Sequence, residues 1–290
     1  MRASAQWCRR LSQRFAARAV DRGVVHLSNY ASEFVVVGDG APLVLVPGLA
    51  GGIELLGRLI SVLAERSRVF CFELRGEREL VAGRVPASFA DFADDLSEFI
   101  DAMLLERPAV AGVSFGSAIG LEFALRYPRQ LNSLVLHGVE PHFRQSLGGQ
   151  IARLALEEYP LPRDNAFFNQ FFRLLFARRE FVGPLFDFVV EQCWKTDQSV
   201  LAHRLRMLAD FDVRGRLGEV RVPSLVVAGE SDAIVSLAAQ RELAKSIAGA
   251  RFASIPASGH LCFLTRPRAF AEHVASLVGR AESSGLPLVA

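Results

Sequence analysis

Short apolar runs, separated by longer amphipathic stretches, constrain the fold of this chain more than any other feature. A strand that is apolar at successive positions must be buried on both faces, which is typical of a parallel sheet covered by helices. One intervening stretch, residues 88–104, has helical apolar spacing behind Ser88, a suitable N-cap. The alternation predicts right-handed crossovers and a mostly parallel, doubly wound α/β sheet, with ligands beyond the carboxyl ends of its strands. The runs lie at residues 43–46, 69–72, 110–112, 134–136, 225–229 and 251–255.

Residues 141–219 interrupt this alternation with sequence that is helical throughout and rich in phenylalanine. Several of these rings come as adjacent pairs, so a single amphipathic face cannot bury them all. We therefore expect an inserted helical cap at 141–219, over a core formed by 24–140 and 220–280. Residues 1–23 are expected to form an N-terminal helix or extension, and 281–290 a loose tail. The phenylalanines are Phe167, Phe168, Phe171, Phe172, Phe176, Phe181, Phe186 and Phe188.

A serine motif lies between an expected strand, 108–111, and an expected helix, 117–127. Gly112-Val113-Ser114-Phe115-Gly116 fits the pattern G-x-S-x-G. In this pattern the serine occupies a strained strand-to-helix turn that is too tight for side chains at the glycine positions. The turn exposes the hydroxyl and directs the backbone N–H of Phe115 toward a developing oxyanion. The motif predicts that Ser114 is a nucleophile.

A serine hydroxyl needs an imidazole to remove its proton, and the imidazole needs a carboxylate to fix its tautomer. Asp232 follows the run 225–229, and His260 follows the run 251–255. Both positions suit these roles. Glu140, after the run 134–136, is a competing acid. His137, at the end of that same run, is a candidate for substrate contact.

These landmarks resemble the α/β-hydrolase superfamily over residues 24–280. Residues 43–48 resemble its third strand and oxyanion loop, and Ser114 matches its nucleophile. Residues 229–235 resemble its acid loop, and 259–278 its histidine loop and final helix. The chain order Ser, Asp, His is the order of this fold.

The resemblance implies that Ser114, Asp232 and His260 form a catalytic triad. It also implies an oxyanion hole made by the backbone N–H groups of Leu49 and Phe115. Two segments depart from the family pattern. Pro47-Gly48 stands where many members have His-Gly, and residues 73–78 match D-x-R-G-x-G only in part.

The expected activity is hydrolysis of an ester-like carbonyl: an ester, thioester, lactone or activated C–C bond. A serine at position 114 excludes the haloalkane dehalogenases and epoxide hydrolases of this fold, which need an aspartate there. An acyltransferase with the same triad and a triad-bearing ligand receptor remain alternatives. Phe168 and Phe172 are candidates for lining a pocket for an apolar small molecule of medium size. The alternative is that the phenylalanines only fill the core of the cap itself.

Composition narrows the possible partners. Lys and Arg number 33 against 31 Asp and Glu, so the formal charge of +2 gives no electrostatic case for nucleic acid. No apolar run approaches the ~18 residues of a membrane span. The excess of arginine over lysine is typical of a GC-rich, bacterial genome.

The cysteines give no sign of a metal site or a disulfide framework. Residues 8, 71, 193 and 262 show neither C-x-x-C nor zinc spacing, so we expect no metal, no cofactor and a reduced, cytoplasmic protein. Residues 1–20 contain several arginines and no acid. We expect a helix lying on the domain there, with a transit peptide as the alternative.

Overall fold

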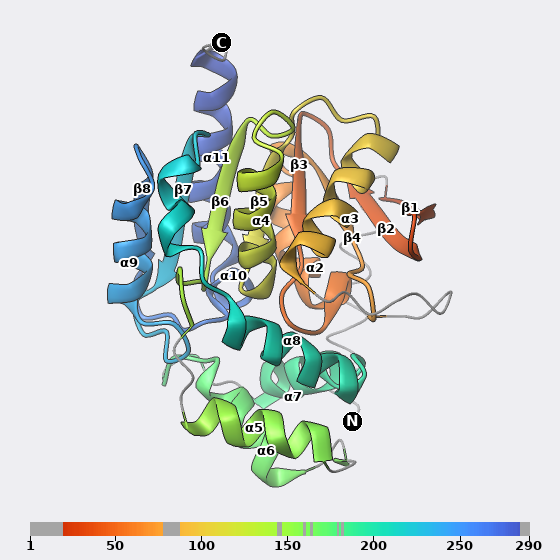
Figure 1. The fold of residues 1–290 in the computed structure, drawn as a ribbon, viewed down its shortest axis with the longest axis vertical. Helices are drawn as coiled ribbons and strands as arrows, with labels where there is room; N and C mark the ends of the chain where they lie inside the picture. Colours follow the sequence, from red (N-terminus) through yellow and green to blue (C-terminus); the bar gives the residue numbers. More distant parts are fainter. Residues whose placement is uncertain are drawn as a thin grey trace.

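The computed structural model of the chain describes residues 20–77, 88–143, 147–158, 161–162, 165–178, 180 and 183–284. These residues contain one eight-stranded sheet in the order β1-β2-β4-β3-β5-β6-β7-β8 (Figure 1). The strands are β1 (Val20–His26), β2 (Ala31–Val37), β3 (Ala41–Val46), β4 (Ser67–Phe72), β5 (Ala109–Val113), β6 (Ser133–His137), β7 (Ser224–Gly229) and β8 (Arg251–Ile255).

The sheet is parallel from β4 to β8 and antiparallel at its other edge. β3 pairs in parallel with β4 and β5, and the parallel pairing continues through β6 and β7 to β8. β2 runs antiparallel to both β1 and β4. The predicted mostly parallel, doubly wound sheet is therefore confirmed.

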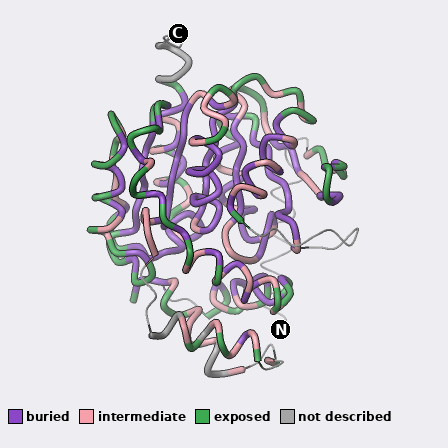
Figure 2. The backbone as a smooth tube through the Cα atoms, viewed as in Figure 1, coloured by how far each residue is buried: buried purple, intermediate pink, exposed green. Residues whose placement is uncertain are grey.

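Each face of the sheet has its own hydrophobic core, which explains why the strands read as continuous apolar runs. In β3, Val44 and Val46 join one core while Leu43 and Leu45 join the other. Buried backbone accordingly fills the centre of the molecule in Figure 2. The helices supplying these cores include α2 (Gly52–Leu63), α3 (Phe89–Ala102), α4 (Phe115–Arg126), α9 (Leu237–Ser246), α10 (Cys262–Thr265) and α11 (Pro267–Ser284).

Local signals set the bounds of α3 as expected. The Ser88 hydroxyl accepts from the backbone N–H of Asp91, and the Asp91 carboxylate accepts from the backbone N–H of Ser88. This reciprocal capping box satisfies two N–H groups that would otherwise lack a partner at the helix start.

The two ends of the core differ from the expected boundaries. Residues 20–23, assigned to an N-terminal extension, belong to β1, in which only Val25 is buried. An edge strand that buries so little shows no apolar run, and the sequence gives no signal for it. Residues 281–284, assigned to a tail, continue α11. Residues 1–19 and 285–290 lie outside the described part of the chain.

Between β6 and β7 the chain forms helices that gather at one end of the sheet (Figure 1). We call α5–α8 the helical insertion. No helix of the described ranges is long and apolar enough to cross a membrane. The insertion consists of α5 (Leu147–Glu158), α6 (Ala166–Leu174), α7 (Gly183–Cys193) and α8 (Gln198–Asp210), and the 3-10 helix η1 (Arg214–Glu219) leads on to β7.

Candidate active site

Ser114 occupies a strained turn between β5 and α4. Its φ of 52° and ψ of −115° lie where residues other than glycine are rarely found. A side-chain carbon at Gly112 would lie 2.4 Å from the Gly116 carbonyl oxygen, and one at Gly116 would lie 2.3 Å from that of Pro47. Only glycine fits these two positions, which is the geometry that the G-x-S-x-G motif predicts.

The structure brings Ser114, His260 and Asp232 together. Nε2 of His260 lies 3.0 Å from the Ser114 hydroxyl oxygen, and Nδ1 of His260 lies 2.9 Å from Oδ2 of Asp232. His260 and Asp232 are buried, whereas Ser114 is half-buried. The arrangement suits transfer of the serine proton to the imidazole, with the carboxylate behind it.

Asp232 is held as an ionised acceptor. Its Oδ1 accepts from the backbone N–H groups of Ile234 (2.8 Å) and Val235 (3.0 Å). Burial alone would raise the pKa of Asp232, but the charge and hydrogen bond of His260 outweigh it and lower the pKa to about 2. The carboxylate at Nδ1 of His260 thus belongs to Asp232 and not to Glu140, the competing acid.

Two residues that the sequence reasoning missed support this acid and base. The completely buried side chain of Gln240 donates to Oδ2 of Asp232 (3.2 Å) and to the Val235 carbonyl (2.9 Å), and it accepts from the Gly138 N–H (2.9 Å). Gly138 has a φ of +65°, and a side-chain carbon there would lie 2.6 Å from Cε1 of His260. Only Gly138 could have been found from the sequence, because it is a glycine directly after a buried strand.

The two expected oxyanion donors border Ser114. Phe115 begins α4, so its N–H belongs to the first turn, where no intrahelical acceptor exists. The loop containing Leu49 lies beside the serine, because a side-chain carbon at Gly48 would be 3.7 Å from Cβ of Ser114. The role of Leu49 and Phe115 as donors stays a prediction.

The segment after β4, which departs from the family pattern, holds this loop region through buried charges. The Glu73 carboxylate accepts from the Ile53 N–H at 3.2 Å, in the first turn of α2. Arg75 forms a buried ion pair with Asp95, and Glu77 forms one with Arg204 of α8. In this segment Glu73 is therefore a structural partner of α2, Arg75 of α3 and Glu77 of the insertion.

His137 lies next to His260, but the expectation that it contacts substrate is wrong. The side chain is completely buried, and its ring nitrogens face the carbonyl oxygens of Val227 (2.8 Å) and His260 (2.7 Å). Two acceptors favour a doubly protonated ring, because a neutral imidazole carries one N–H. Burial alone would lower the pKa of His137, but Cys262 and Asp232 raise it above its ordinary value. His137 therefore supports the histidine loop through its contact with the His260 carbonyl.

The expected pocket residues are only partly described. The side chain of Phe168 lies outside the described part of the structure. Phe172 is half-buried and packs edge-on against Trp194, with ring centroids 6.2 Å apart. Their contact with a substrate stays a prediction. Across the described ranges, no group of three or more His, Cys, Asp and Glu residues could hold a metal ion.

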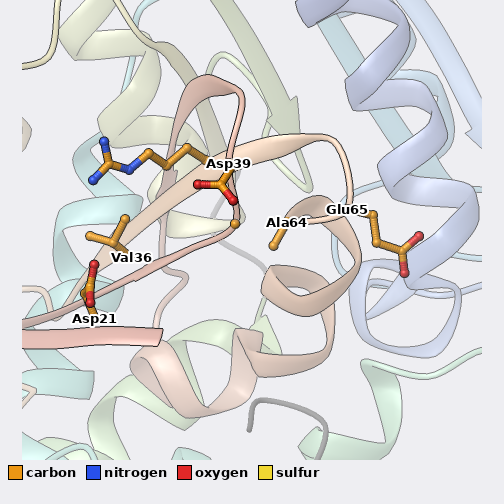
Figure 3. Close-up of a pocket in the computed structure, with 7 residues that line it drawn as sticks. Asp21, Val36, Asp39, Ala64 and Glu65 are labelled. Atoms are coloured by element: carbon orange, nitrogen blue, oxygen red, sulfur yellow. The ribbon is translucent and has the colours of Figure 1, made fainter. Parts of the chain in front are cut away.

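A polar hollow of about 300 Å³ lies away from these residues (Figure 3). Part of its wall comes from the residues just before β3 and β4, at the amino ends of these strands, whereas Ser114 follows the carboxyl end of β5. The hollow is therefore separate from the candidate active site. It is lined by Asp21, Val36, Gly38, Asp39, Ala64, Glu65 and Arg68.

Comparison with known proteins identifies the fold family. The sequence profile described as alpha/beta hydrolase fold matches residues 41–267. A protein of Azorhizobium caulinodans named "Putative carbamate hydrolase RutD" is 26% identical over 254 residues, covering 85% of this chain and 94% of its own. The pimeloyl-[acyl-carrier protein] methyl ester esterase of Aromatoleum aromaticum is 29% identical over 248 residues, covering 78% and 93%.

A solved structure shares the fold at lower sequence identity. The thermophilic esterase of Thermogutta terrifontis superposes with a TM-score of 0.79 at 21% identity, over 90% of this chain and 99% of its own. The family profile spans well over half of the chain and includes both the serine turn and the histidine loop. The chain therefore belongs to the α/β-hydrolase fold family.

Proposed function

We propose that this protein is a serine hydrolase that cleaves an ester-like carbonyl compound with an apolar moiety. One observation carries the proposal: the continuous hydrogen-bonded series from the Ser114 hydroxyl through the His260 ring to the Asp232 carboxylate. The 3.0 Å link has a length that suits proton transfer from Ser114 to a general base, and the 2.9 Å link holds the His260 ring in the tautomer that this transfer requires.

In the acylation step the Ser114 oxygen attacks the substrate carbonyl carbon while its proton passes to Nε2 of His260. The carbonyl oxygen gains the negative charge, which the N–H groups of Leu49 and Phe115 stabilise. His260 then returns the proton to the leaving group as the scissile bond breaks. Asp232 stabilises the transient imidazolium and keeps its Nδ1 proton directed inward.

Deacylation repeats these roles with water as the nucleophile. His260 takes a proton from the water as its oxygen attacks the acyl carbon, and the new tetrahedral oxyanion uses the same two donors. The proton then returns to the Ser114 oxygen as the acyl–oxygen bond breaks. The products are the free acid and the regenerated serine.

The names of the relatives support the substrate class. A carbamate and a methyl ester both have a carbonyl carbon bonded to a heteroatom leaving group, which suits attack by serine. The helical insertion contributes aromatic and aliphatic side chains, including half-buried Phe172, to a hydrophobic cluster that also contains Leu49 of the loop beside Ser114. Each ring that packs on an apolar substrate group contributes on the order of 2 kcal/mol to binding.

The test combines covalent labelling with a substrate panel. A fluorophosphonate should label the wild type at Ser114, and Ser114→Ala should lower kcat by on the order of 10⁴ or more. Ser61→Ala, on α2, is the matched control and should change neither result. The panel compares nitrophenyl esters of graded acyl length, methyl esters, aryl carbamates and sugar acetates.

Two results would contradict the proposal separately. A Ser114→Ala variant that keeps a tenth of the wild-type kcat would exclude the nucleophile. Sugar acetates as the best substrates would exclude the apolar substrate class and leave the nucleophile in place.

A further inference from the structure

Arg204, on α8 of the helical insertion, has the largest completely buried side chain of the described residues. Burying a guanidinium is costly unless partners satisfy its charge and its N–H groups. Its Nη1 donates to the Leu49 carbonyl oxygen (2.6 Å) and to the Glu77 carboxylate, and its Nη2 donates to the Arg75 carbonyl oxygen (3.0 Å). A charged group of the insertion thus reaches the loop between β3 and α2.

A second contact ties the same loop to the insertion. The hydroxyl of Thr196 accepts from the Gly51 N–H (3.2 Å) and donates to the Glu77 carboxylate (2.6 Å). Glu77 therefore bonds to both side chains that hold this loop. Two backbone groups of the loop, the Leu49 carbonyl and the Gly51 N–H, are held by side chains from the insertion side.

Arg204 also contacts the other expected oxyanion donor residue. Its guanidinium carbon lies 5.6 Å from the centre of the Phe115 ring, within cation–π range. The same side chain thus bonds to Leu49 and packs on Phe115. These are the two residues whose backbone N–H groups would stabilise the oxyanion.

Stability alone does not account for this arrangement. Replacing a buried ion pair by apolar residues is often neutral or stabilising, so the pair is weak evidence of a stabilising role. The Nε of Arg204 is buried with no hydrogen-bond partner among the described residues, which adds a further cost. An apolar side chain would avoid both costs, but it would leave the Leu49 carbonyl without this donor.

We propose that Arg204 is a positioning residue for the oxyanion hole. From the insertion it fixes the backbone of Leu49, whose N–H must point at the developing negative charge with an accuracy of about 0.5 Å. The insertion then affects the rate of the chemical step. This inference rests on the proposed serine hydrolase function.

The test separates ground-state binding from stabilisation of the tetrahedral state. Kinetics of the preferred ester are measured together with the affinity for an alkyl boronic acid, which forms a tetrahedral adduct with a serine nucleophile. Arg204→Met should lower kcat by about 100-fold, as for loss of one oxyanion donor, with KM within threefold of the wild type. The boronic acid should lose affinity by a similar factor, and Arg204→Lys should keep part of both.

Two further variants control for folding and for general effects on α8. Arg204→Met/Glu77→Gln removes both charges, so it avoids leaving Glu77 buried and unpaired, and it should show the same loss of kcat. Arg206→Met lies on the same helix, where Arg206 is 53% exposed and pairs with Glu157. It should behave as the wild type in both assays.

The outcomes distinguish this inference from the proposed function. A wild type that fluorophosphonate does not label at Ser114 overturns the proposed function, and the inference with it. If the wild type is labelled, a folded double variant with unchanged kcat and boronic acid affinity overturns the inference alone. So does a variant in which only KM rises.

Discussion

Replacing Asp232 by Asn tests whether the acid loop dictates the tautomer of His260. Oδ1 of Asp232 accepts from two fixed backbone N–H groups, those of Ile234 and Val235. The amide oxygen of the introduced side chain must therefore take the Oδ1 position. The amide NH₂ then replaces Oδ2, 2.9 Å from Nδ1 of His260.

Gln240 cannot relieve this arrangement by flipping its own amide. In its present orientation it donates to the Val235 carbonyl and accepts from the Gly138 N–H, and a flip would lose both bonds. The introduced amide must then donate to Nδ1 of His260, so the ring proton moves to Nε2. With its proton facing Ser114, the ring cannot act as the base.

The expected loss for Asp232→Asn is about 10⁴ in kcat/KM, or roughly 5.5 kcal/mol of transition-state stabilisation. The assay is kcat/KM for the best ester of the panel, together with ¹⁵N NMR of the His260 ring at neutral pH. Glu140→Gln is the control and should lower kcat/KM by less than about threefold.

The reasoning fails if Asp232→Asn stays within tenfold of the wild type, or if NMR still finds the proton on Nδ1. A larger loss in Glu140→Gln than in Asp232→Asn would assign the acid to the end of β6 instead.

Three further predictions follow from the geometry. Gly138→Ala should lower kcat more than tenfold with little loss of helix by circular dichroism, because the new methyl would displace the His260 ring; a wild-type rate would refute the contact. The pKa of Asp232 is lowered to about 2 in the folded state, so the ionised carboxylate contributes about 2 kcal/mol to the free energy of unfolding. This contribution is present above the ordinary pKa of aspartate, near 4, and is lost as the pH falls toward 2. In urea unfolding, the wild type should therefore lose more stability than Asp232→Asn between pH 6 and pH 2.5, and parallel curves would contradict this. Ser88→Ala should cost about 1 kcal/mol of unfolding free energy through loss of the capping box, with kcat unchanged; an equal unfolding midpoint would show that the cap contributes nothing.

The central sheet was predictable because its strands are buried on both faces. Successive side chains of residues 43–46 enter the two cores in turn, so every position of the strand is apolar. Few folds other than a sheet covered by helices on both faces accommodate such a strand. β1 was not predicted, because only Val25 of this strand is buried and it therefore has no continuous apolar run. Antiparallel edge strands with one solvated face resemble loops in sequence.

The three candidate catalytic residues were predictable because each follows a strand. In the parallel sheet, β5, β7 and β8 all have their carboxyl ends on the same side, so residues that are distant in sequence meet there. Gln240 and Arg204 had no such signal, because each reads as an ordinary polar residue of a helix. Gln240 bonds to a residue 102 positions away, and Arg204 bonds to Leu49 across 155 positions. Partnerships of this kind depend on how helices pack, which local patterns do not encode.

The free thiols of the described residues lie in three different regions, and all of them are buried. Cys71 is in β4, Cys193 in α7 of the insertion, and Cys262 in α10 beside the histidine loop. Alkylation of a buried thiol requires a local opening of the fold, so its rate reports how often that region opens. An insertion that opened as an independent lid would expose Cys193 long before Cys71. Peptide mass spectrometry of a single alkylation time course would therefore rank how often the sheet, the insertion and the histidine loop open, without any substitution.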